Sequence, residues 1–164
     1  MATGTERFLA AAAERGVTAD VRHFPEGTRT AEDAARAVGC EIGQIVKSLV
    51  LMADDRALVA LTSGHNQADL ERVKGIVGAR SVRRARPEEA REATTFAIGG
   101  TPPFGYPQPL RVLMDADLMA YDEVWAAAGS PDAVFPIDPE TLRQASGAEI
   151  GEFGSRRDPH NPRV

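Results

Sequence analysis

The chain has 164 residues, a formal net charge of −5 and a sequence pI near 5.2. This length suits one domain that buries a sizeable core without metal ions or disulfides. The acidic balance argues against broad nonspecific binding to nucleic acid, so we expect no DNA partner, although a local basic patch is compatible with it.

Cysteine usage and hydropathy point to the cytoplasm. Cys40 is the only cysteine, so it cannot form an internal disulfide. No apolar run is long enough to span a membrane, and Met1 to Arg15 lacks the basic start and apolar core of a signal peptide. No histidine pair or acidic cluster has metal-ligand spacing. We therefore expect a cytoplasmic protein with no metal, no other cofactor and no membrane partner.

The first part of the chain predicts a helix, a strand and a second helix. Residues 6–15 carry apolar side chains at helical spacing and end before a glycine. Residues 19–24 alternate weakly, which favours a short strand before a Pro-Glu-Gly turn. Thr30 is placed to cap a helix that runs to Val38.

Residues 45–52 are eight residues rich in branched apolar side chains between a glycine and a polar turn, which predicts a buried strand. Lys47 lies within this strand, so its ammonium group must reach a polar cavity, an anion or solvent. Lysine stems also commonly lie along apolar surface with the charge in water, so the pattern alone leaves a purely structural Lys47 equally open.

The next segment predicts a hairpin, a loop and a helix. Residues 57–61 form a second apolar run, and the short connection favours antiparallel pairing with the strand before it. Residues 63–66 are expected to form a polar loop, with Asn66 capping a helix to about Val73. His65 in this loop could act as a general base, although no acid near it in sequence would orient it.

A basic segment follows. Residues 81–82 suggest an edge strand, and Pro87 suits the first turn of a short helix. Positive charge gathers here in an otherwise acidic chain, which favours contact with phosphate groups but is equally typical of a solvated face. The arginines concerned are Arg80, Arg83, Arg84 and Arg86.

The loop over residues 99–105 reads Gly-Gly-Thr-Pro-Pro-Phe-Gly. Its glycines let backbone amides approach a ligand closely, whereas its prolines fix the chain and remove two donors. A rigid loop with a few free N–H groups suits a substrate carbonyl or an oxyanion. It is also typical of a tight corner with no function.

The last part of the chain predicts alternating strands and helices. From Gly154 onward the sequence has no apolar pattern. We therefore expect one domain over residues 1–153 and a disordered tail over residues 154–164. The expected elements are a strand over residues 110–114 that ends at Asp115, a helix over 122–128, a strand over 133–137 and a helix over 139–145.

Four segments in this order resemble the YbaK/ProX family of aminoacyl-tRNA deacylases, which includes the editing domain inserted in bacterial prolyl-tRNA synthetases. They are Thr-x-x-Asp-Ala-Ala at residues 30–35, Gln-Ile-Val-Lys-Ser-Leu-Val at 44–50, the loop at 99–105, and Met114-Asp115. The resemblance covers roughly residues 3–153. It implies a mixed α/β (α+β) fold with a curved, largely antiparallel sheet flanked by helices.

The resemblance also implies trans-editing, which is hydrolysis of an amino acid wrongly esterified to the terminal adenosine of a tRNA. Lys47 matches the functional lysine of the family, and Gly99 with the amides after it matches the loop that holds the substrate carbonyl. Both would stabilise negative charge on the carbonyl oxygen while water attacks, and the neighbouring ribose hydroxyl would help transfer the proton. An accessible lysine is protonated at neutral pH, so we assign Lys47 to positioning and charge stabilisation.

We expect the 3′ acceptor end of an aminoacyl-tRNA as substrate and an aminoacyl-tRNA synthetase as a second candidate partner. The amino acid stays open, because Pro102 stands where many members carry a small hydroxyl residue. Two alternatives also remain: a noncatalytic module that binds aminoacyl-tRNA or a synthetase, and an esterase for small amino-acid esters. The expected catalytic residues are Lys47, Gly99 and Gly100; the substrate-binding residues are Thr30, His65, Thr101, Pro103, Phe104 and Gly105; and the tRNA contacts are Arg80, Arg83, Arg84 and Arg86.

Overall fold

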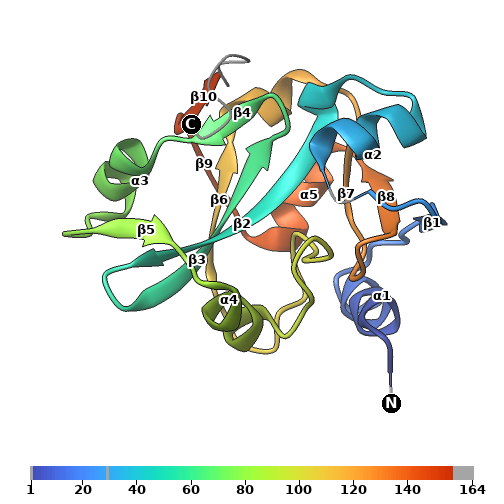
Figure 1. Ribbon diagram of the computed structural model, residues 1–164, viewed down its shortest axis with the longest axis horizontal. Coiled ribbons are helices and arrows are strands. Elements are labelled where there is room, and N and C mark those ends of the chain that lie inside the picture. Colours follow the sequence, from blue (N-terminus) through green and yellow to red (C-terminus); the bar gives the residue numbers. More distant parts are fainter. Residues whose placement is uncertain (1, 29, 157–164) are drawn as a thin grey trace.

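The structure of the protein is a computed structural model that describes residues 2–28 and 30–156. An eight-stranded sheet runs through the middle of the molecule, with two long neighbouring strands at its centre (Figure 1). Its strands are β1 (Arg22–His23), β2 (Ile45–Ala53), β3 (Arg56–Ser63), β5 (Val82–Arg84), β6 (Arg111–Asp115), β7 (Val124–Ala127), β8 (Ala133–Ile137) and β9 (Glu149–Gly151).

The strand order is β1-β8-β7-β2-β3-β6-β9, and β5 pairs with the far end of β2. A separate two-stranded sheet joins β4 (Asn66–Ala68) to β10 (Gly154–Arg156). Among the described residues, five strand pairings are antiparallel and three are parallel. The expected mixed fold with a largely antiparallel sheet flanked by helices is therefore confirmed.

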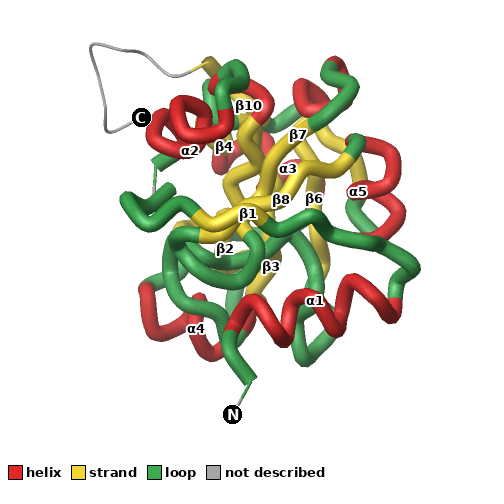
Figure 2. Tube along the Cα trace, turned by 90° about the vertical axis from the view of Figure 1, so that its right-hand side faces the viewer, coloured by secondary structure: helices red, strands yellow, loops and turns green. Residues whose placement is uncertain are grey.

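Helices cover both faces of the sheet, and Figure 2 shows α1 and α2 on opposite sides of the strands. The helices pack through small or apolar residues at helical spacing, such as Phe8 and Ala12 of the first helix and Ala31, Ala34 and Ala35 of the second. They are α1 (Gly4–Glu14), α2 (Ala31–Val38), α3 (Leu70–Val77), α4 (Pro87–Thr94) and α5 (Pro139–Ser146), with two 3-10 segments, η1 (Ile42–Gln44) and η2 (Ala116–Ala120).

The side chains of β2 alternate between the two faces. Val46 packs into the cluster that contains residues of α1 and α5. On the other face, Ile45 packs under α2 and Leu51 packs in the cluster that contains Val73 of α3. Lys47 shares the face of Ile45 and Leu51, so it lies where the apolar cluster under α2 ends and the cluster under α3 begins.

Several expected local signals are present. The Thr30 hydroxyl accepts a hydrogen bond from the Asp33 amide at 3.0 Å, which confirms it as the cap of α2. The strand with Lys47 and its antiparallel partner are confirmed as β2 and β3. The strand expected over residues 19–24 is reduced to the two residues of β1.

The helix expected over residues 122–128 is wrong, because this segment forms β7. Trp125 and Ala126 pair in parallel with Ile45 and Val46 of β2, and the other edge of β7 pairs with β8. A short apolar run does not distinguish strand from helix, and here pairing with distant strands decides the outcome.

The expectation that Asn66 caps a helix is also wrong, because Asn66 begins β4 and its side chain turns inward. Asp69 caps α3 instead, accepting hydrogen bonds from the amides of Glu71 and Arg72 at 3.0 and 3.2 Å. The expected disordered tail is corrected for residues 154–156, which pair with β4 as β10, and its remainder lies outside the described residues. No helix in the described ranges is long and apolar enough to cross a membrane.

Candidate functional site

The centre of β2 has a strand on one side only. Ile45 and Val46 pair with β7, and residues 51–53 pair with β5. Between them, residues 47–50 pair with β3 alone among the described strands. A pocket of about 520 Å³ opens at this gap. Its walls come from β2, β7, the start of α2, the end of β5 and the loop after α4.

The register of β2 determines which of its backbone groups face the gap. The Gly64 amide donates to the Ile45 carbonyl at 2.7 Å, so odd-numbered residues of β2 direct their backbone groups toward β3. Even-numbered residues direct theirs away, as the 3.0 Å hydrogen bond from the Ala85 amide to the Val50 carbonyl illustrates. Ser48 therefore turns its N–H and C=O toward the pocket.

Ser48 itself lines the pocket, and its Oγ is buried without a hydrogen-bond partner among the described residues. A buried hydroxyl without a partner costs free energy, so this position is unusual for a strand that otherwise carries apolar side chains. The sequence places Ser48 next to Lys47 in the same strand, which was the only indication of its position. The register that turns its backbone groups toward the pocket could not be predicted from the sequence.

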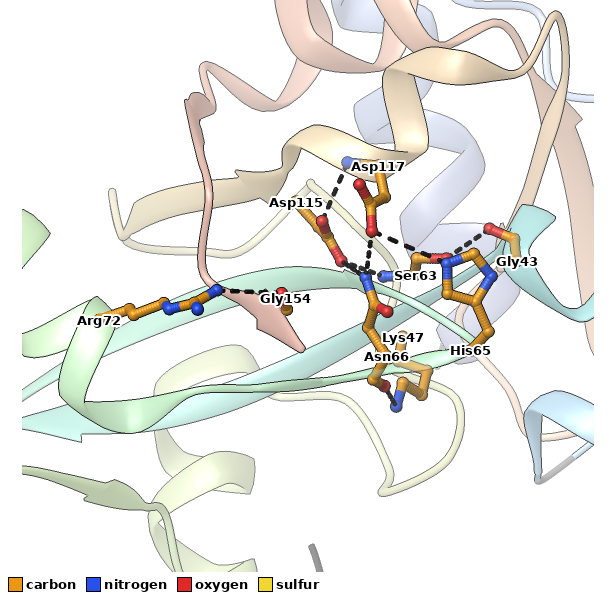
Figure 3. Close-up of polar contacts among 9 residues, drawn as sticks. All are labelled: Gly43, Lys47, Ser63, His65, Asn66, Arg72, Asp115, Asp117 and Gly154. Atoms are coloured by element: carbon orange, nitrogen blue, oxygen red, sulfur yellow. Dashed lines mark hydrogen bonds and ion pairs between the residues drawn. The ribbon is translucent and has the colours of Figure 1, made fainter. Parts of the chain in front are cut away.

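Lys47 lines the same pocket, and its Nζ donates a hydrogen bond to the backbone carbonyl of Asn66 at 2.5 Å (Figure 3). The ammonium is therefore directed by a fixed backbone acceptor while its stem lies at the pocket wall. Gly99, Thr101 and Thr30 are distant in sequence, yet they line this pocket with Lys47.

The first half of the loop over residues 99–105 faces the pocket. Gly99 has a φ of +84°, a left-handed conformation that favours glycine. Gly100 lies behind it, where its amide donates to the Ala97 carbonyl at 3.0 Å. A Cβ on Gly100 would come within 2.6 Å of the Ser130 backbone, so a glycine is needed for this close approach.

The second half of the loop belongs to the core. Phe104 is 2% exposed, and its ring centroid lies 5.2 Å from that of Phe8 and 6.3 Å from that of Phe135. Pro103 is buried, and neither it nor Phe104 nor Gly105 lines the pocket. Three of the expected substrate-binding residues therefore lie behind the pocket.

The buried hydroxyl of Tyr106 anchors this half of the loop by donating to the Pro102 carbonyl at 2.7 Å. Burial raises the pKa of Tyr106, which favours the protonated phenol that donates this hydrogen bond.

His65 lies away from the pocket, in the turn between β3 and β4. Its Nε2 lies 3.8 Å from Asp117 Oδ2 and has no hydrogen-bond partner among the described residues. Its ring packs closely on Gly43, where an added Cβ would come within 2.3 Å of the His65 Nδ1.

The four arginines predicted to contact tRNA differ in the groups that they contact. Arg84 lines the pocket and has no ion pair among the described residues. Arg83 forms two 2.8 Å hydrogen bonds with Glu89, and these, with the Arg86 amide, lower the pKa of Glu89 to about 2. Arg86 lies 3.4 Å from Glu89, and the amide of Arg80 binds Asp54. Arg84 is thus the arginine of this segment that reaches the pocket.

The described part of the chain has no group of three or more His, Cys, Asp or Glu side chains that could hold a metal ion. The pocket instead brings together the Lys47 side chain, the Ser48 backbone and the turn at Gly99. Such an arrangement can bind a carbonyl and stabilise negative charge that develops on its oxygen.

Comparison with known proteins agrees with this arrangement. Residues 25–145 match the model of the aminoacyl-tRNA editing domain family. The chain is 28% identical over 132 residues to the uncharacterized protein YwhH of Bacillus subtilis (strain 168), which covers 80% of this chain and 83% of that protein. It is 35% identical over 83 residues to the proline–tRNA ligase of Thermosipho melanesiensis, but spans only 14% of that ligase.

A solved structure is similar over nearly the whole chain. It is described provisionally as a trans-editing enzyme for prolyl tRNA synthetase. The similarity has a TM-score of 0.88 and 44% identity, and it covers 94% of this chain and 99% of the other. Because the family model matches most of the chain, the protein belongs to the aminoacyl-tRNA editing domain family, and its resemblance to the YbaK/ProX proteins is confirmed.

Proposed function

We propose that the protein is an aminoacyl-tRNA deacylase that works in trans, hydrolysing the ester between a small mischarged amino acid and the 3′ end of a tRNA. The observation that carries this proposal is that Lys47 and the turn at Gly99, which are far apart in sequence, line one pocket. The family of the chain and the solved structure similar to it support the same reaction class.

In the proposed reaction, the ester carbonyl lies among the Lys47 ammonium, the Ser48 amide and the turn at Gly99. A water molecule attacks the carbonyl carbon, and negative charge builds on the carbonyl oxygen. The Lys47 ammonium and the backbone N–H groups stabilise that charge in the transition state. The ester C–O bond then breaks, the ribose oxygen takes a proton, and the free amino acid leaves.

The substrate itself supplies the general base. The hydroxyl next to the ester on the terminal ribose removes a proton from the attacking water and passes it to the leaving oxygen. An ester is already activated, so the reaction needs neither a protein nucleophile nor a metal-bound water.

The side chains of the pocket wall would contact the amino acid of the proposed substrate. Ala31, Ala34 and Ala126 line the pocket beside the larger Trp125 and Ile45. The pocket has a volume of about 520 Å³, and the terminal nucleoside would occupy part of it. Discrimination by size amounts to roughly 1–3 kcal/mol per methylene, so several small amino acids could share the site.

The test is a deacylation screen of the purified protein against tRNAs charged with Ala, Cys, Ser, Pro and other amino acids. Lys47→Ala should lower kcat/KM by about 100- to 1,000-fold on the accepted substrate, as loss of an oxyanion-stabilising group does. Lys74→Ala is the matched control, because Lys74 is the only other lysine of the chain and lies on α3.

Selective loss of one or two aminoacyl groups, abolished by Lys47→Ala and kept by Lys74→Ala, would support the proposal. Binding of charged tRNA without turnover would instead favour a noncatalytic module. Equal turnover of a free amino-acid ester and the charged tRNA would favour a small-molecule esterase. A fully active Lys47→Ala protein would contradict the mechanism.

A further inference from the structure

A polar cluster with three buried members lies beside Lys47 (Figure 3). We call Ser63, Asn66, Asp115 and Asp117 the Asn66 cluster. Its members come from the end of β3, the start of β4, the end of β6 and the start of η2. None of them lines the pocket that holds Lys47, so the proposed reaction has not used them.

Asn66 is the link between this cluster and the pocket. It is 1% exposed, and its Nδ2 donates to Asp115 Oδ2 at 2.9 Å and to Asp117 Oδ2 at 2.7 Å. These two hydrogen bonds use both hydrogens of the amide, and they fix its orientation because an amide oxygen could not face two carboxylates. The backbone carbonyl of the same residue accepts the hydrogen bond from Lys47 Nζ.

Asp115 holds the other side of the cluster. It is 1% exposed, and its Oδ2 accepts from the Ser63 amide as well as from Asn66, while its Oδ1 accepts from the Asp117 amide, both amides at 3.0 Å. Its hydrogen-bond donors are therefore neutral groups. Burying a carboxylate among neutral donors is costly compared with apolar packing, so stability alone does not account for this arrangement.

The strand β10 closes the cluster. A Cβ on Gly154 would come within 2.5 Å of both Asn66 Nδ2 and Asp115 Oδ2, so β10 can lie this close only with glycine there. The backbone around Asn66 is thus held from three directions: by β6 and η2 through the carboxylates, and by β10 through strand pairing with β4.

We propose that Asn66 is a positioning residue that sets the place of the Lys47 ammonium in the pocket. The two carboxylates fix the Asn66 side chain, the side chain fixes the backbone carbonyl, and the carbonyl holds Lys47 Nζ in one position. This inference rests on the proposed deacylation for its kinetic consequence. The structural part of the inference, that the position of Lys47 depends on Asn66, does not depend on the substrate.

The first experiment observes Lys47 directly. The chain contains two lysines, Lys47 and Lys74, so protein labelled with ¹³C-lysine gives two side-chain Cε signals in an NMR spectrum. Lys47→Ala assigns them. Asn66→Ala should shift and broaden the Lys47 signal and leave that of Lys74 unchanged. Gln67→Ala, the neighbouring change on β4, should move neither signal.

The second experiment measures turnover of the accepted aminoacyl-tRNA. Asn66→Ala should lower kcat by about 10- to 100-fold, the size expected when a catalytic group is displaced by about 1 Å, with KM nearly unchanged. Asp117→Ala covers the case in which Asn66→Ala does not fold, because the Asp117 side chain is 52% exposed and its removal opens no buried cavity. Asp117→Asn keeps an acceptor oxygen for Asn66 and should restore most of the activity.

Three outcomes would overturn the proposal. In the first, the Lys47 signal stays unchanged in folded Asn66→Ala or Asp117→Ala protein. In the second, the loss of kcat is no larger than the fraction of unfolded protein explains. In the third, Asp117→Asn is as impaired as Asp117→Ala. If the wild-type protein deacylates nothing, the proposed function fails, and the NMR comparison still decides whether Asn66 positions Lys47.

Discussion

The two halves of the loop over residues 99–105 differ in what they contact. Gly99 and Thr101 line the pocket with Lys47, whereas Phe104 packs against Phe8 and Phe135 in the core. One short motif thus contains residues that line the pocket and residues that hold the loop in place. A motif match therefore identifies the segment that matters, and the structure is needed to separate binding from support.

The largest expected effect is a loss of stability, and it comes from the second half of the loop, which packs in the core. Phe104→Ala should lower the free energy of unfolding by about 3–5 kcal/mol, because it leaves a cavity beside the rings of Phe8 and Phe135. Urea unfolding followed by circular dichroism measures this change. The activity per folded molecule should remain near that of the wild type, and a selective loss of activity in fully folded protein would place Phe104 in the site after all.

A smaller loss of stability, together with a loss of activity, is expected from a change in the first half of the loop, which lines the pocket. Gly99→Ala should cost about 1–2 kcal/mol of stability because of its left-handed backbone. The space itself is open, since the nearest atom to an added Cβ is Pro131 Cβ at 3.8 Å. The strained turn should relax and move its amide, so kcat should fall much more than for Phe104→Ala. Equal kcat values for the two folded variants would remove the distinction between the halves.

The same contrast applies to two neighbouring arginines. Arg84→Ala should raise KM for the tRNA and lower the slope of log affinity against log salt by about 1, as loss of a phosphate contact does. Arg83→Ala should change both values less, since Arg83 is already paired with Glu89. Binding titrations at several salt concentrations measure this difference, and a larger effect of Arg83→Ala would reverse the assignment.

The smallest expected effect is a pH dependence at Glu89. Its pKa falls from 4.5 to about 2, first through hydrogen bonding from the Arg83 side chain and then from the Arg86 amide. A carboxyl whose pKa is lower in the folded protein stabilises the fold above its unfolded pKa and loses that contribution as the pH falls. Glu89→Gln should therefore flatten the Tm profile between about pH 4.5 and 2. An unchanged profile would show that the exposed Arg83 pair is fully screened.

The sequence was most informative where the signal was local. A charged residue inside an apolar strand indicated Lys47, and a Gly-Pro pattern indicated the loop at Gly99. Local capping rules also placed Thr30 correctly. These residues depend on neighbours within a few positions, which a single sequence contains.

The residues that the sequence misassigned depend on distant partners. Asn66 has the side chain of a helix cap, but its amide binds Asp115, which lies 49 residues further along the chain. Trp125 lies in a strand because β2 is there to pair with it. Ser48, which the sequence did not single out, turns its backbone groups toward the pocket because of the register of β2 with β3. No local pattern specifies this register.

The gap at residues 47–50 also bears on strand addition between molecules. An unpaired stretch of strand is a template on which another chain can add a strand and begin to aggregate. Here the exposed edge is only four residues long and is closed at one end by β7 and at the other by β5. An intruding strand would clash with both neighbours before it formed a continuous ladder, so this edge is open to a small molecule and closed to another polypeptide strand.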